Sequence, residues 1–338
     1  MTDTATGLPS YAELRRRQDA PPGSAWRLFG DSDEIGTLNL LTPERVRRAR
    51  RLIRTGEVVN LDLPLNAFNP ALIASRHPLK HHLFANNPFH RDDWIDALYT
   101  QSSSQMDGLR HIGHPDHGFY NGADPARFLE GDPYLGINRY AEHGIAGRGV
   151  LLDVGRHLDE TGTPIDHTTN HGITTADLDA TARAQGVNVL PGDILMIRLG
   201  WAGHYLNTLD HAGRAEALRP PFRCPGLEQS HEMVEWLWDH GVAVVAADNF
   251  ALEAWPPAAN SPFIARAERT GAVPTTSHTG LMHRVLIPLL GVAIGELWAL
   301  DDLAARCADD SVWECFVTVK PLTLTGGAGS PANALAIR

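Results

Sequence analysis

The chain has 338 residues, of which 43% are hydrophobic, and this is enough apolar material for a large buried core. Its formal net charge of −11 at pH 7 argues against a nucleic-acid partner, because phosphate binding needs a concentrated basic surface. It has no apolar run of about 18 residues, and its first residues lack the basic flank and apolar core of a signal peptide, so we expect a cytoplasmic protein without a membrane partner.

The N-terminal region is polar and rich in proline, and we predict an arm over residues 1–30 and a single α/β domain over residues 31–338. Thr42 can cap the first helix of that domain, because a proline follows it and apolar residues then recur at helical spacing. The elements expected in this part of the chain are a short helix at 11–17, a helix at 43–55, a strand at 57–63 and long loops over 64–96.

The rest of the chain alternates short apolar runs with amphipathic segments. Strands are expected at 148–154, 192–200, 242–247 and 312–319, helices at 174–186, 231–240 and 282–290, and a turn at 326–331. This alternation of strand and helix predicts an α/β fold. No internal repeat or flexible linker indicates a second domain.

Histidines cluster in one part of the chain, since seven of the 17 lie between residues 77 and 117. Within this region Asp107 and His111 are four residues apart and would share one face of a helix, whereas Gln105 and Asp107 would share one face of a strand. A carboxylate with an imidazole suits Zn²⁺ or Mn²⁺, and no CxxC pair accompanies the three cysteines. The alternative is that Asp107 caps a turn and His111 forms a hydrogen bond in the core.

A second candidate pair lies further along the chain, where His283 and Glu296 stand at the two ends of an apolar segment. A buried glutamate there needs a partner, which a metal, a base or an arginine could supply. Further polar or aromatic residues are candidates for binding a substrate, and two of them directly follow a buried strand. These candidates are Arg110, His114, Asp248, Glu253, His278 and Trp94.

Segments spread over nearly the whole chain resemble the cyclase superfamily that includes bacterial kynurenine formamidase and isatin hydrolase, specifically its longer branch. In the formamidase-like members the motif HxGTHxDxxxH and a later His/Glu pair bind two divalent ions. Here Asp107 and His111 match the end of that motif, and Gln101 and Gln105 replace its first two histidines. The similar segments are Asp33–Pro43, Gln101–His111, Gly144–Asp153, Gly192–Trp201, His283–Glu296 and Gly326–Ala332.

The resemblance implies a compact domain of the swivelling β/β/α kind, assembled as a homo-oligomer, that acts on a small molecule. It also implies one Zn²⁺ or Mn²⁺ ion held by Asp107, His111, His283 and Glu296, with Gln105 as a further candidate; a metal-free site remains an alternative, because an amide is a weaker ligand than an imidazole.

The expected activity is hydrolysis of a carbonyl C–N or C–O bond in a cyclic amide or imide, a lactone or a formamide. His283, Glu296 and His111 are the candidate catalytic residues, as proton acceptors where they do not bind the ion. Two alternatives stay open at this point. One is a metal-assisted cyclase or dehydratase of secondary metabolism, and the other is a small-ligand-binding protein that has lost catalysis.

Overall fold

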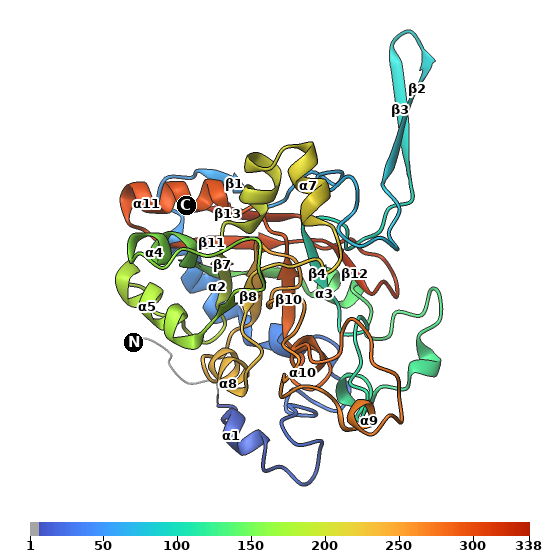
Figure 1. The fold of residues 1–338 in the computed structure, drawn as a ribbon, viewed down its shortest axis with the longest axis vertical. Helices are drawn as coiled ribbons and strands as arrows, with labels where there is room; N and C mark the ends of the chain where they lie inside the picture. Colours follow the sequence, from blue (N-terminus) through green and yellow to red (C-terminus); the bar gives the residue numbers. More distant parts are fainter. Residues whose placement is uncertain (1–6) are drawn as a thin grey trace.

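A computed structural model describes residues 7–338, which form a single α/β domain around a nine-stranded mixed sheet (Figure 1). The four strands β5, β7, β9 and β10 are parallel neighbours, and the strands on either side of them pair antiparallel. In spatial order the strands are β1 (Val58–Asn60), β13 (Ala334–Ile337), β11 (Glu314–Val319), β5 (Ile145–Asp153), β7 (Ile194–Arg198), β9 (Val244–Ala247), β10 (Ala293–Glu296), β4 (Gln105–Asp107) and β12 (Gly329–Pro331).

The parallel strands are buried on both faces, which explains why they read as continuous apolar runs. Helices α2, α4 and α5 pack against β5 and β7 and cover part of the sheet. The helices are α1 (Tyr11–Leu14), α2 (Pro43–Ala49), α3 (Asn138–His143), α4 (Val154–Glu160), α5 (Thr175–Gln185), α6 (Trp201–Gly203), α7 (His211–Ala217), α8 (His231–Asp239), α9 (Arg266–Arg269), α10 (His283–Leu286) and α11 (Asp301–Asp310).

Shorter elements complete the fold. Two small sheets stand apart from the main one, a hairpin of β2 (Lys80–Asn87) with β3 (His90–Asp96) and a pair of β6 (Gly172–Ile173) with β8 (Gly226–Leu227). Single turns of 3-10 helix occur at Gly36–Leu40, Arg50–Leu52, Tyr120–Gly122 and Pro125–Arg127, and a π-helical turn at His204–Thr208.

Most predicted elements are confirmed, because their ends carry clear local signals in the sequence. Helix α5 begins at a capping box, in which the Thr174 hydroxyl accepts from the Asp177 amide and the Asp177 carboxylate accepts from the Thr174 amide. It ends at Gly186, whose φ of 66° is the left-handed conformation that glycine adopts most easily. The predicted helix at 282–290 is shorter, because α10 ends at Leu286 just before Pro288.

The expectation of long loops over residues 64–96 is wrong for its second half. Strands β2 and β3 form a hairpin that projects from the body, at the upper right of Figure 1. Nearly all of its residues are exposed, so the hairpin has no buried face. Its sequence therefore lacks the regular alternation of apolar and polar residues that predicts a half-buried strand. Cross-strand contacts maintain the pairing, including stacked rings of His82 and Trp94 with centroids 3.9 Å apart.

The N-terminal segment packs on helix α8 rather than standing alone. The Tyr11 amide donates to Asp239 at 2.7 Å, and the Trp238 indole donates to the Pro9 carbonyl at 2.9 Å. The first six residues of the predicted arm lie outside the described residues, and a boundary at residue 30 stays a prediction.

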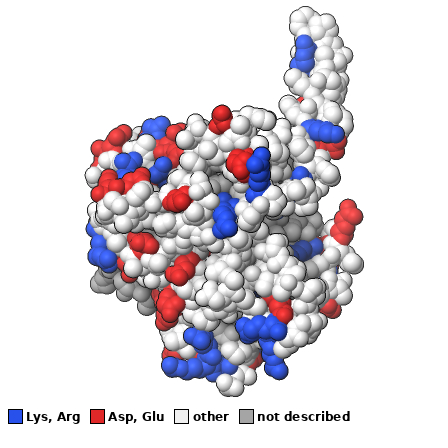
Figure 2. All heavy atoms as spheres, in the orientation of Figure 1, with Lys and Arg blue, Asp and Glu red and all other residues white. Residues whose placement is uncertain are grey.

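Between residues 7 and 338, no helix combines the length and hydropathy needed to cross a bilayer. On the side seen in Figure 2, acidic and basic side chains are intermingled.

We expect that Gly149→Ala destabilises the protein by about 1–3 kcal/mol, the usual cost of overpacking a core. A Cβ at this position of β5 would lie 2.3 Å from a methyl group of the buried Val317 and 3.0 Å from the end of Met196. Urea unfolding measures the change. Gly172→Ala in β6 is the control, because its Cβ would make an ordinary 3.4 Å contact with Glu228, and we expect a change of at most about 0.5 kcal/mol. Equal stabilities of the two variants would contradict this account.

Candidate metal centre and adjoining cavity

The candidate centre forms where strands β4 and β10 lie side by side. Their antiparallel register places Gln105 opposite Glu296, and Asp107, two residues further along β4, points to the same side. Glu296 is the last residue of β10, at the carboxyl end of the parallel strands, where α/β proteins commonly bind ligands. The sequence left open whether Asp107 shares a helix face with His111 or a strand face with Gln105, and the structure has the strand.

Asp107, His283 and Glu296 converge into a buried group that could hold a metal ion. One ligand atom from each lies within 4.8 Å of the others. The His283 Nε2 atom is 3.0 Å from Glu296 Oε1 and 3.7 Å from Asp107 Oδ2. The three side chains are at most 7% exposed, so their charges are poorly screened by water.

Glu253 lies behind His283 and sets the orientation of its ring. Its carboxylate accepts from the backbone amides of Met282 at 2.6 Å and His283 at 2.9 Å, and it contacts the His283 Nδ1 atom at 2.7 Å. A carboxylate on Nδ1 keeps the proton there and directs Nε2 toward a metal, which is the usual second partner of a metal-binding histidine. Glu253 was predicted to contact substrate, but it is fully buried on the far side of the imidazole.

The two glutamines of the motif direct their amide groups at the carboxylates. Gln101 Nε2 donates to Asp107 Oδ1 at 2.5 Å and lies 3.2 Å from the His111 ring, and Gln105 Nε2 donates to Glu296 Oε2 at 2.7 Å. Two buried oxygens, Asp107 Oδ2 and Gln105 Oε1, have no hydrogen-bond partner within residues 7–338. Unpaired buried acceptors are costly, and a cation beside Asp107 would satisfy its Oδ2 atom.

These residues fit a divalent ion. Burial raises the pKa of Asp107, as expected of a carboxylate with too little positive charge around it. Burial lowers the pKa of His283, but its contacts with Glu253 and Glu296 outweigh this effect and raise the pKa well above its usual value, so that a bound cation would displace a proton. Two carboxylates, an imidazole and an amide oxygen form a donor set that suits Mn²⁺ or Zn²⁺.

His111 stands outside this group, although it was predicted to bind the ion. Its Nε2 atom is 4.0 Å from Asp107 Oδ1, and its side chain is 23% exposed. The ring lines the cavity that opens in front of the carboxylates. The structure thus brings together three of the four expected ligands, whereas His111 lies beside Gln101 in the lining of this cavity.

The cavity in front of the centre has a volume of about 490 Å³ and mostly apolar walls. His278, a predicted substrate contact, lies in its lining, and burial lowers the pKa of this imidazole to about 4. The lining residues are Leu72, Ile73, Ala74, Ser75, Arg76, Gln101, Gln105, His111, Ile112, Leu218, Pro220, Phe222, Phe250, Ala251, Trp255, Ser277, His278, Leu281, His283 and Glu296. We call this the active-site cavity.

Arg76 is a charged residue of the active-site cavity that the sequence did not indicate. Its guanidinium donates to the Gln101 carbonyl and lies close enough to Asp107 and Glu296 to interact with their charges. Burial lowers its pKa, and the two carboxylates oppose this effect. Arg76 lies in an irregular segment, where no periodicity shows which side chain faces inward.

Arg110 and Asp248 were predicted to bind substrate, but the structure uses both to hold the backbone. The Arg110 guanidinium donates to the carbonyls of Leu129, Asp132, Tyr134 and Gly326. Asp248 accepts from the amides of Leu199 at 2.8 Å and Gly200 at 2.7 Å. Neither belongs to the lining of the active-site cavity, because their polar atoms already satisfy buried backbone groups.

His114 and Trp94 are also absent from that lining, among the residues that the structure describes. The His114 Nδ1 atom accepts from the Asp116 amide at 3.0 Å, and its ring packs on His117. Trp94 lies on the projecting hairpin and is 53% exposed. Sequence proximity to the motif therefore did not bring either residue to the centre.

Comparisons with known proteins identify the family of the chain. Residues 59–254 match the model of the Cyclase family, whose description reads "Putative cyclase". A solved structure described as a novel cyclase is 33% identical, aligns over 93% of this chain and 99% of its own, and superimposes with a TM-score of 0.77. No curated protein sequence matches the chain.

Two solved isatin hydrolases are more distant and show only a shared fold. Isatin hydrolase A from Ralstonia solanacearum is 18% identical, with 83% of this chain and 91% of that chain aligned and a TM-score of 0.55. The enzyme from Labrenzia aggregata, bound to benzyl benzoate, is 14% identical over 83% of this chain and 93% of that chain, with a TM-score of 0.56. The family match over more than half of the chain and the 33% identical structure together show that the chain belongs to the cyclase family.

Proposed function

We propose that this protein is a metal-dependent hydrolase that cleaves a carbonyl C–N or C–O bond in a cyclic amide or imide, a lactone or a formamide. The observation that carries the proposal is the buried group of Asp107, His283 and Glu296, with Glu253 fixing the His283 ring behind it. This arrangement stands at one end of an apolar cavity of the size that small-molecule sites have.

Asp107, His283 and Glu296 would hold the ion, and the unpaired Gln105 Oε1 atom is a fourth candidate ligand. Bound there, Zn²⁺ or Mn²⁺ would polarise the substrate carbonyl and favour ionisation of the attacking water. Gln101 donates to Asp107 and so helps to keep that carboxylate in place. Hydrolysis adds one water across the C–N or C–O bond and yields a carboxylate together with an amine, an alcohol or, from an imide, an amide; a cyclic substrate opens to one molecule that carries both groups.

His111 is the proton acceptor that the geometry favours. Its ring faces the active-site cavity beside Asp107, whereas His283 is already engaged on both ring nitrogens. His278 lines the same cavity and is neutral at pH 7, because burial holds its pKa at about 4. The Arg76 guanidinium supplies positive charge to the cavity and is placed to receive the carboxylate that hydrolysis produces.

A cyclase or dehydratase reaction is the second candidate, favoured by the description of the 33% identical structure as a cyclase. The same residues would then act on a substrate that loses water instead of gaining it. Product mass separates the two reactions, since hydrolysis adds one water to the substrate and dehydration removes one.

A homo-oligomeric state and a cytoplasmic location stay predictions.

Elemental analysis of the purified protein, combined with chelation and reconstitution, tests the proposal. We expect one equivalent of Zn or Mn per chain, loss of activity after chelation, and recovery on adding either ion. A panel of lactones, cyclic imides and N-formyl anilines supplies the assay. Protein that retains no ion and hydrolyses none of the panel with Mn²⁺ or Zn²⁺ added would contradict a metal-dependent hydrolase.

A further inference from the structure

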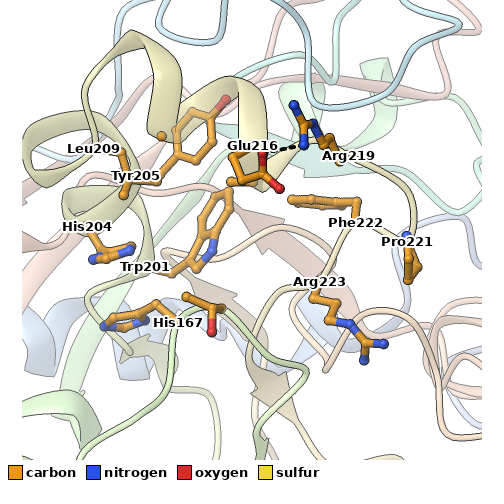
Figure 3. A pocket seen from close by; sticks show the side chains of 13 residues that line it. His167, Trp201, His204, Tyr205, Leu209, Glu216, Arg219, Pro221, Phe222 and Arg223 are labelled. Atoms are coloured by element: carbon orange, nitrogen blue, oxygen red, sulfur yellow. Dashed lines mark ion pairs between the residues drawn. The ribbon is translucent and has the colours of Figure 1, made fainter.

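A second cavity, of about 380 Å³ and shown in Figure 3, shares the lining residue Phe222 with the active-site cavity, and residues of one chain segment line both cavities. This segment is residues 217–223. Leu218 and Pro220 line the active-site cavity, whereas Ala217 and Pro221 line the second, and Phe222 lines both. We call the second cavity the distal cavity.

A row of aromatic rings runs from one cavity into the other. Trp255 and Phe250 line the active-site cavity, and Trp201 and Tyr205 line the distal one, with Phe222 between. Neighbouring ring centroids are 5.3 Å apart for Phe250 and Trp255, 5.4 Å for Phe222 and Phe250, 6.2 Å for Trp201 and Phe222, and 5.3 Å for Trp201 and Tyr205. These five residues form a continuous aromatic wall.

The aromatic wall belongs to a hydrophobic cluster that is separate from the main core. Several members of this cluster are only partly buried, including Leu72, Leu209, Ala217 and Phe222, and the surface they leave uncovered faces the two cavities. Apolar surface turned toward a water-filled cavity is unfavourable unless a ligand covers it. A ligand with an apolar part would cover this surface.

The polar residues of the distal cavity contribute little net charge. His167 and His204 stack with ring centroids 4.8 Å apart, and burial lowers the pKa of His167 to about 4, so this ring is neutral at pH 7. At the rim, Arg219 pairs with Glu216 at 2.7 Å, as Figure 3 shows, and Arg223 is exposed. A neutral alkyl or aryl group suits these surroundings better than a charged one.

We propose that the distal cavity receives the apolar tail of the substrate while its reacting carbonyl lies at Asp107, His283 and Glu296. The substrate class is then a cyclic amide, lactone or formamide that carries an alkyl or aryl substituent several atoms long. This inference rests on the proposed function for the position of the reacting end, and on the aromatic wall for the position of the tail.

Binding of N-alkyl-2-pyrrolidinones, measured by isothermal titration calorimetry, tests the inference without requiring turnover. The ring mimics a cyclic amide, and methyl, butyl and hexyl tails probe increasing depth. We expect the dissociation constant to fall roughly three- to fourfold per added methylene, as for burial of a CH₂ group. Ala217→Trp would fill the distal cavity, so its affinity for the hexyl compound should fall at least about tenfold while that for the methyl compound changes less than about twofold.

Ala215→Trp is the matched control, because Ala215 lies on the same helix α7, is exposed and lines neither cavity. It should bind the whole series like the unchanged protein. Ala217→Phe, with Ala215→Phe as its control, replaces the pair if the tryptophan variant fails to fold. Hexyl affinity that is equal in the Ala217 variants and the unchanged protein, or that does not rise with tail length, would overturn the inference.

The same compounds separate this inference from the proposed function. Suppose that binding depends on tail length and on Ala217, but the reconstituted protein hydrolyses no lactone, cyclic imide or N-formyl aniline. The assignment of the distal cavity would then stand, and the hydrolase function would be refuted. Hydrolysis of short lactones, without tighter binding of compounds with longer tails, would support the hydrolase function and refute the role of the distal cavity.

Discussion

Asp107→Asn should abolish binding of the proposed ion and lower turnover by more than about 100-fold, a larger loss than is usual for residues that only hydrogen-bond to a metal ligand. The asparagine keeps the shape of the side chain but removes its negative charge and one acceptor oxygen. In the structure Asp107 Oδ2 is buried, unpaired within residues 7–338 and 3.7 Å from His283 Nε2. Metal content per folded chain and turnover with excess Mn²⁺ or Zn²⁺ are the measurements.

Asp248→Asn is the matched control for that variant. Asp248 is equally buried and follows strand β9, which is two strands away from β4 in the sheet, but its oxygens accept from the backbone amides of Leu199 and Gly200. Its replacement should lower the melting temperature and leave a full equivalent of metal in the folded protein. If Asp107→Asn also kept its metal and its turnover, the assignment of the centre would be wrong.

Glu253→Gln should weaken metal binding and lower turnover by roughly 10- to 100-fold, as when the carboxylate partner of a metal-binding histidine is lost. A carboxylate accepts from the His283 ring and from two backbone amides at once, whereas the amide NH₂ group of glutamine cannot accept. The ring then loses its fixed tautomer and orientation. Competition with a chelator of known affinity measures the metal dissociation constant.

Glu268→Gln controls for the general cost of neutralising a buried glutamate near α10. Glu268 is 6% exposed, pairs with Arg284 at 2.5 Å, and accepts from Thr279. It should lose stability without a change in metal affinity, because Arg284 and not His283 is its partner. A Glu253 variant that binds metal as tightly as the Glu268 variant would show that Glu253 does not position the ligand.

Elements whose signals are local could be predicted from the sequence. The cap at Thr174 and the glycine at Gly186 mark both ends of α5, and the strands β7 and β9 appear as apolar runs because both of their faces are buried. The resemblance also named Asp107, His283 and Glu296, which the structure brings together. These features depend on residue types and spacing within short stretches of chain.

Other elements depend on contacts that no short stretch reveals. The hairpin β2–β3 lacks a buried face, so its strands have no alternating pattern to detect. Helix α11 was missed because its buried residues Leu303, Ala304 and Cys307 are outnumbered by charged ones. Strand β13 is only four residues long, and its pairing with β1 and β11 is what makes it a strand.

The sequence by itself determined the fold class and the apolar strands β5, β7 and β9, and its resemblance to a family named candidate metal ligands. Only the tertiary structure decided where each candidate side chain lies and what it contacts. Glu253 faces His283 rather than a substrate, His111 faces the cavity, and Arg76 enters the active-site cavity from an irregular segment. The physical reason is that burial and hydrogen-bond partners set the role of a polar side chain, and both arise when strands and loops distant in sequence pack together.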